Sequence, residues 1–219
     1  MRIKNNIVEV FILVSGLLLL LNSSDPVLYN DSSRYLEGSL KDPPLYSFII
    51  SIMQLIFRNL NSVIIMQTLV MVIGIIFFTN TLSTLFNLNI LKKFIVAIFL
   101  FLPTIKFYDH LLTEPFSNAF SLLLVSFVVR LICNFNFQNL IWSSIFVVIL
   151  LLMRNQFILL YPVILILYLC LFTVNLKKKT FVMLTISFLS ILFIHNSLST
   201  LNKYIKQDSF DNKTLLTSD

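Results

Sequence analysis

Charged residues and glycine are scarce in this chain of 219 residues. Charged residues make up 12% of the sequence and only three residues are glycine, whereas 58% are hydrophobic. A water-soluble domain carries about 25% charged residues, so this composition excludes an ordinary soluble protein. Together with a mean hydropathy of +0.92, it predicts an all-α integral membrane protein that is embedded in the lipid bilayer.

Several chemistries are excluded by motifs that the sequence lacks. The two cysteines, Cys133 and Cys170, lie in apolar runs without CxxC spacing, so they are expected to be core residues and not a disulfide or zinc pair. There is no glycine-rich phosphate loop, nucleophile elbow or internal repeat, and we expect no organic cofactor. The net charge of +6 comes from short basic blocks beside apolar runs, which indicates anionic lipid head groups and no nucleic acid.

The first apolar run, Ile7 to Leu21, follows Arg2 and Lys4 but precedes no small-residue cleavage site. We therefore expect an uncleaved first helix whose N-terminus is cytoplasmic. The abundance of Phe, Ile, Leu, Asn and Lys is typical of a low-GC bacterial genome, which predicts a multi-pass protein of the bacterial inner (plasma) membrane. The later apolar runs are Leu45 to Phe57, Ser62 to Phe86, Phe94 to Phe107, Pro115 to Cys133, Leu140 to Met153, Phe157 to Leu176 and Thr180 to Leu198.

The run at 45–57 is too short to cross, because at about 1.5 Å per residue it covers roughly 20 Å of a core of about 30 Å. Its polar residues recur every three or four positions, so it is predicted to be an interfacial helix. The polar break Arg154-Asn155-Gln156 divides the stretch from 140 to 176 into a helical hairpin. The sequence thus predicts about seven transmembrane helices in a domain at 1–198, followed by a polar extracytoplasmic tail at 199–219.

Lysine and arginine do not decide the orientation, because this topology places eight on each side. The acids favour it, since all of them except Glu9 then lie outside and the inner loops are purely basic. Asp31, Asp109 and Glu114 would share the outer face. An ionised carboxylate beside hydrocarbon costs several kcal/mol, roughly 3 on insertion scales, so these loops are candidate functional sites.

The order of these features resembles a known family. An Asp-x-x-x-Tyr element at 31–35 is followed by a Pro-Pro-Leu-Tyr turn at 43–46, a helix carrying Pro103, a Leu-Thr-Glu-Pro element at 112–115 and Arg154. This order is similar to the amino-terminal half of the C-fold glycosyltransferases that use polyprenyl-phosphate sugars, particularly the protein O-mannosyltransferase and lipid A aminoarabinose transferase group. Many relatives carry Asp-Glu at the first motif, where Ser32 follows Asp31 here, and relatives usually continue through more spans.

The resemblance implies an inverting hexosyl or pentosyl transferase that moves a sugar from a polyprenyl phosphate to an acceptor of the cell envelope. Such a reaction needs a base for the acceptor hydroxyl and positive charge for the phosphate. Asp31 is the candidate catalytic base, with an Asx turn or helix cap as the structural alternative. The supporting loop residues are Tyr35, Pro43, Pro44 and Tyr46.

Four residues are candidates for binding the donor phosphate or a metal. Glu114 is expected to hold Mg²⁺ or Mn²⁺ or a phosphate-binding arginine, or else to be a helix-start acid favoured by the helix dipole. Arg154 is expected to bind the lipid phosphate, or else to anchor a hairpin at the interface. Asp109 and His110 could complete a metal site, although a single histidine in a loop is more often solvated.

A second functional class stays open. The chain could be a non-catalytic or truncated half of such an enzyme that scaffolds a second membrane subunit supplying further spans. A small transporter is a further alternative, although no pair of broken helices occupies matching positions.

Overall fold

The computed structural model describes residues 6–22, 26–28, 30–37, 43–175 and 178–216. The regular secondary structure of these ranges is helical, apart from one isolated bridge between Val27 and His110. The α-helices are α1 (Ile7–Leu21), α2 (Asn30–Glu37), α3 (Pro44–Phe57), α4 (Asn61–Phe86), α5 (Ile90–Phe107), α6 (Thr113–Cys133), α7 (Phe137–Met153), α8 (Leu160–Asn175) and α9 (Lys178–Leu216), with a 3₁₀ turn, η2 (Asn155–Leu159), before α8. The all-helical class expected from the sequence is confirmed.

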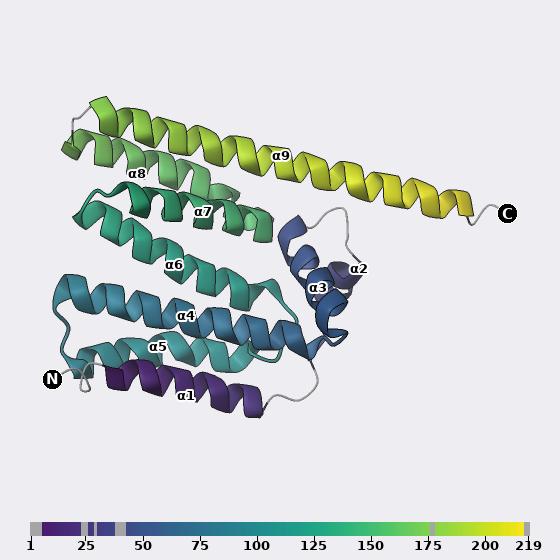
Figure 1. Ribbon diagram of the computed structural model, residues 1–219, viewed down its shortest axis with the longest axis horizontal. Helices are drawn as coiled ribbons and strands as arrows, with labels where there is room; N and C mark the ends of the chain where they lie inside the picture. Colours follow the sequence, from purple (N-terminus) through teal and green to yellow (C-terminus); the bar gives the residue numbers. More distant parts are fainter. Residues whose placement is uncertain (1–5, 23–25, 29, 38–42, 176–177, 217–219) are drawn as a thin grey trace.

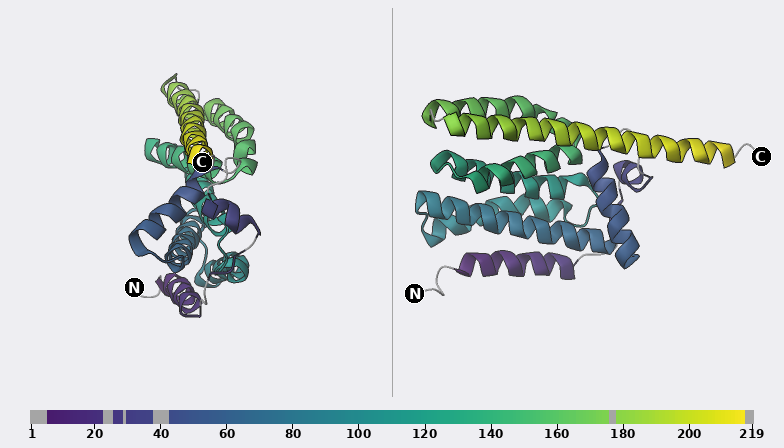
Figure 2. Two further views of the ribbon diagram at one scale, coloured as in Figure 1. Left: turned by 90° about the vertical axis from the view of Figure 1, so that its right-hand side faces the viewer. Right: turned by 45° about the horizontal axis from the view of Figure 1, so that its top comes forward.

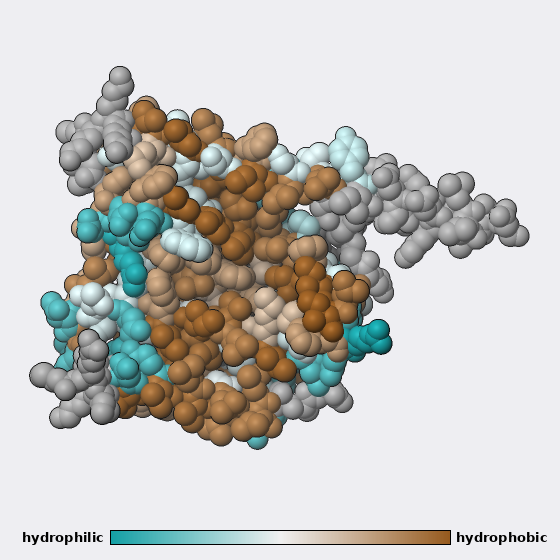
Figure 3. Space-filling view, viewed as in Figure 1, coloured by the Kyte–Doolittle hydropathy of each residue, from teal (hydrophilic) through white to brown (hydrophobic). Residues whose placement is uncertain are grey.

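The long helices run back and forth between two ends of the molecule (Figure 1). One end, called here the basic end, holds the start of α1, the start of α5 with Lys92 and Lys93, and Arg130 near the end of α6. The opposite end, called the α3 end, holds α2, α3, the loop at 108–112 and the break at Arg154. Hydrophobic side chains cover most of the surface between the two ends (Figure 3).

Among the described residues, four segments are long and apolar enough to cross a membrane: Asn61–Phe86, Thr113–Cys133, Asn155–Thr173 and Thr180–Leu201. The helices α1 and α7 have 15 and 17 residues, fewer than the roughly 20 that a hydrocarbon core of about 30 Å requires. The 18 residues of α5 include three lysines. Membrane spans are therefore supported by length and composition for four of the seven expected segments.

Helix α3 lies across the end of the bundle, and two views show the same crossing (Figures 1 and 2). Pro43 is extended at φ −57° and ψ 145°, Pro44 occupies the first turn, and Arg58 ends the helix in the left-handed region at φ 52°. Proline favours both the extended entry and the helix start. The expected polar stripe is incomplete, because Ser47 is buried against the bundle while Leu55 on the same helix is 81% exposed.

The bundle packs most tightly around α4. A Cβ atom on Gly74 would lie 3.0 Å from the carbonyl oxygen of Ala119 in α6, so the small residue allows the two backbones to approach closely. At the basic end, the Lys93 ammonium donates to the Glu9 carboxylate between α5 and α1. The one acid expected on the inner side is thus neutralised by a lysine that is 84 positions away in the chain.

Helix α9 continues through most of the segment expected to be a polar tail, 199–219, as far as Leu216, and extends past the α3 end of the bundle (Figure 1).

Candidate functional site

The two acidic loops of the sequence meet at the α3 end. The Val27 amide donates to the Asp109 carbonyl at 2.9 Å, and the Leu111 amide donates to the Val27 carbonyl at 3.1 Å. The Ser32 hydroxyl, which is fully buried, donates to the Leu111 carbonyl at 2.8 Å. The structure therefore joins the loop after α1 to the loop before α6, as the shared face predicted from the acids requires.

Asp31, the candidate base, is the second residue of α2, and its side chain lies outside the described part of the structure. Its backbone is held next to the second loop because Ser32, the following residue, bonds to that loop. Asp31 therefore lies inside a helix, whereas the alternative interpretation expected it at a helix cap or in an Asx turn. The catalytic role of Asp31 stays a prediction.

Glu114 and Arg154 form an ion pair at this end. Nη1 of Arg154 donates to Oε1 of Glu114 at 3.0 Å, and the two side chains are 27% and 35% exposed. Glu114 lies in the first turn of α6, where the helix dipole favours an acid, and Thr113 donates to its other oxygen at 3.4 Å. Glu114 thus contacts an arginine and also lies at a helix start, and the binding of a lipid phosphate by that arginine stays a prediction.

Arg154 reaches this position because α7 ends at Met153 and the chain turns through an extended residue into η2. A guanidinium group has five N–H donors, and the bond to Glu114 uses one of them. The side chain is therefore held in place by an acid and is still partly exposed, which suits it to bind an incoming anion.

A buried polar bridge of two hydrogen bonds connects α3, α4 and the loop at 108–112. The Tyr46 hydroxyl donates to Oε1 of Gln67 at 3.3 Å, and Nε2 of Gln67 donates to the His110 carbonyl at 3.2 Å. Burial raises the pKa of Tyr46, and the neighbouring Tyr35 and the charge of Glu114 raise it further. The phenol is therefore a neutral hydrogen-bond donor that ties α3 to α4 and to the second loop.

Tyr35 and Tyr46, both predicted as supporting residues, are in edge-to-face contact with ring centroids 5.0 Å apart. Gln67 was missed at the sequence level. The signal for it was the one amide among the mostly apolar residues at 63–78 of α4, since a polar side chain within a membrane span requires a partner.

Asp109 and His110 contact each other, with Oδ1 and Nδ1 2.7 Å apart. Within the described residues, no group of three or more His, Cys, Asp or Glu side chains is placed to hold a metal ion. The metal role expected for Glu114 therefore has no cluster to support it in that part of the chain.

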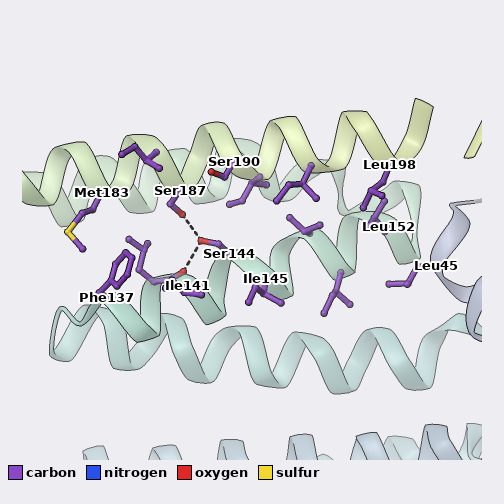
Figure 4. A pocket seen from close by; sticks show the side chains of 16 residues that line it. Leu45, Phe137, Ile141, Ser144, Ile145, Leu152, Met183, Ser187, Ser190 and Leu198 are labelled. Atoms are coloured by element: carbon purple, nitrogen blue, oxygen red, sulfur yellow. Dashed lines mark hydrogen bonds between the residues drawn. The ribbon is translucent and has the colours of Figure 1, made fainter. Parts of the chain in front are cut away.

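A long apolar groove lies between α7 and α9 (Figure 4). Its volume is about 910 Å³, and its lining runs from Phe137 and Met183 at one end to Leu198 and Leu45 of α3 at the other. This groove could not be predicted from the sequence, because it depends on how two apolar helices separate in space.

No family model, no curated protein and no solved structure matches this chain. The resemblance to C-fold glycosyltransferases therefore stays a prediction from the short motifs of the sequence.

Proposed function

We propose that this chain is a glycosyltransferase of the bacterial inner membrane, which transfers a sugar from a polyprenyl phosphate to a cell-envelope acceptor at the α3 end. The observation that carries the proposal is the Glu114–Arg154 ion pair beside the two joined loops. It supplies a positioned, partly exposed cation at the start of α6, directly after the loop that Ser32 of α2 contacts.

The orientation follows from the charges at the two ends. Lysine and arginine divide evenly between the two sides, but Asp109 and Glu114 lie at the α3 end and Glu9 at the basic end, so we assign the basic end to the cytoplasm. This places the α3 end outside and lets α1, α5 and α7 cross with the four longer spans. Short spans are accommodated by local thinning of the bilayer.

In the proposed reaction, the acceptor hydroxyl oxygen bonds to the anomeric carbon while the bond from that carbon to the phosphate oxygen breaks. The hydroxyl proton goes to the Asp31 carboxylate, and the electron pair leaves with the polyprenyl phosphate. Arg154 binds and neutralises that phosphate, and Glu114 fixes the guanidinium in position. Attack opposite the leaving group inverts the anomeric configuration.

The test is sugar transfer per molecule of purified protein, measured as protein-dependent release of polyprenyl phosphate from the sugar donor. Asp31→Asn keeps the size of the side chain but removes proton acceptance, so transfer should fall by about 10² to 10⁴. Asn30→Asp/Asp31→Asn, which moves the carboxylate by one residue in α2, is the matched control and should not restore the rate. Wild-type turnover in Asp31→Asn would end the catalytic assignment.

A second candidate function is a membrane scaffold that binds a further subunit. The observation that favours it is the low burial of the last two spans, with 17% of Asn155–Thr173 and 11% of Thr180–Leu201 buried, against 56% of Asn61–Phe86. A purified chain without transferase activity that gains it on adding a second membrane subunit would favour this alternative.

A further inference from the structure

The basic end holds an arginine that is fixed in place without an acid. Nε of Arg130 in α6 donates to Oγ1 of Thr81 in α4 at 3.0 Å, and its guanidinium carbon lies 4.4 Å from the centroid of the Phe77 ring. Glu9 is the one acid of the described ranges at this end, and it already accepts from Lys93. Arg130 therefore has no carboxylate partner in the part of the chain that the structure describes.

The two contacts of Arg130 leave the far edge of its guanidinium unused. A guanidinium group has five N–H donors, and the bond to Thr81 uses the single donor on Nε. The four donors on Nη1 and Nη2 meet no acceptor among the described residues. These two nitrogens form a planar fork that matches two oxygens of a phosphate, and the side chain is partly exposed. The geometry therefore suits an anion that approaches from outside the protein.

Arg130 lies at the level of lipid head groups. It belongs to the last turn of α6, and its partner Thr81 lies in the polar stretch that follows the apolar part of α4, formed by Thr79, Asn80, Thr81, Ser83 and Thr84. Such a change from apolar to polar residues marks the boundary of the hydrocarbon core. Trp142, near the start of α7, is 48% exposed, and tryptophan is enriched at the same boundary. Lipid phosphates lie directly beside this level.

An aromatic row extends sideways from the cation. Phe77 packs on Phe127 of α6 with ring centroids 4.9 Å apart, and Phe127 stacks on Trp142 of α7 at 6.0 Å. These three partly exposed rings, called here the aromatic row, cross three helices, of which α6 is the middle one (Figure 1). A free anion would use only the guanidinium, whereas a phospholipid would also place an acyl chain against the rings.

We infer that Arg130 and the aromatic row form a site for an anionic phospholipid of the leaflet at the basic end, with the lipid phosphate on Nη1 and Nη2. A carboxylate in a membrane helix of another protein would also neutralise Arg130. The bulky rings favour the lipid, because membrane helices approach one another closely where their residues are small. The site lies at the opposite end of the bundle from the Glu114–Arg154 pair, so it does not rest on the proposed function.

The experiment uses Trp142 as its probe, because it is the only tryptophan of the chain. The full chain is reconstituted in phosphatidylcholine bilayers in which a fixed fraction of the lipid is brominated on its acyl chains, as phosphatidylglycerol or as phosphatidylcholine. Bromine quenches indole fluorescence on contact, so the two degrees of quenching give the relative affinity of the site for the two lipids. We expect a preference for phosphatidylglycerol of about threefold to tenfold.

The variants test whether one arginine accounts for this preference. Arg130→Gln should abolish it, and Arg130→Lys should retain part of it, because an ammonium group keeps the charge without the fork. Lys92→Gln is the matched control, since it removes an exposed cation of α5 at the same end and should leave the preference unchanged. The unfolding midpoint shows whether each variant folds, and Arg130→Lys carries the comparison if Arg130→Gln does not fold.

Four results would overturn the inference. Equal quenching by the two lipids in the unaltered chain would do so whatever the variants show. An equal loss of preference in Lys92→Gln and Arg130→Gln would indicate general surface charge. Loss of the preference on adding inorganic phosphate at constant ionic strength would indicate a site for the free anion. An unchanged preference in Arg130→Gln, together with release of a co-purifying membrane protein, would assign Arg130 to a partner's carboxylate.

Discussion

Removing the charge of Arg154 should weaken binding of the sugar donor while changing the stability of the fold only slightly. Arg154→Gln keeps a polar side chain at the break after α7 but removes the cation that we assign to the lipid phosphate. Because both members of the Glu114–Arg154 pair are about one-third exposed, solvent screens the pair and its loss should cost the fold less than about 1 kcal/mol.

The effect on donor binding should be much larger. Hydrogen bonds between charged groups contribute about 1.5 to 3 kcal/mol each, so losing the contact between guanidinium and phosphate should raise the KM for the donor about 10- to 100-fold. Arg154→Lys should give an intermediate value, because an ammonium group retains the charge without the bidentate geometry. Glu114→Gln should raise KM more modestly, since it removes the group that orients Arg154 and leaves the cation in place.

The assay is the initial rate of polyprenyl phosphate release against donor concentration, with the unfolding midpoint of each purified variant measured in parallel. Arg58→Gln is the control, because Arg58 is an exposed arginine at the same end of the bundle. An unchanged KM in Arg154→Gln would refute the assignment of the phosphate site. A fall in activity proportional to a fall in the unfolding midpoint would assign Arg154 to hairpin anchoring.

Three further predictions concern the architecture. Tyr46→Phe should destabilise the fold by about 1 to 3 kcal/mol, because it leaves a buried amide without its donor, as measured by thermal unfolding in detergent. Gly74→Val should force α4 and α6 apart, because even a Cβ atom at this position would lie 3.0 Å from the facing backbone. The substitution should lower the free energy of unfolding by about 1 to 3 kcal/mol or prevent stable expression, and Gly74→Ala should lower it less. In a cysteine-free background, Ser33→Cys should react with an impermeant thiol reagent added outside intact cells and Asn89→Cys should not, and the opposite pattern would invert the proposed orientation.

Local chemistry made part of this structure predictable. The Pro43-Pro44 pair fixes both the extended entry and the start of α3, because proline restricts its own backbone and that of the preceding residue. The polar residues after Met153 end α7 because charged and amide groups are costly in hydrocarbon. Both features depend on a few neighbouring residues, so a single sequence was enough to locate them.

Contacts between distant helices could not be read from the sequence. The Glu9 carboxylate meets the Lys93 ammonium 84 residues along the chain, and Gln67 reaches a carbonyl 43 residues away. Hydrophobic periodicity predicts that each helix is buried or lipid-facing but does not select its neighbour, since most apolar faces are chemically alike. The groove has the same origin, because it exists only where α7 and α9 diverge.

The length of α7 accounts for the location of the proposed chemistry. Its 17 residues extend about 25 Å, roughly 5 Å less than the hydrocarbon core that they must cross in the proposed orientation. With the start of α7 at the inner boundary of the hydrocarbon core, the backbone of Arg154 lies at or slightly within the outer boundary, and its long side chain can extend toward the lipid phosphates. A cation at that depth is costly without a counter-charge, and Glu114 at the start of α6 supplies one at 3.0 Å. In the proposed function a lipid phosphate supplies a second counter-charge at the same depth, so that a helix shorter than the hydrocarbon core places the arginine at its end near the lipid head groups.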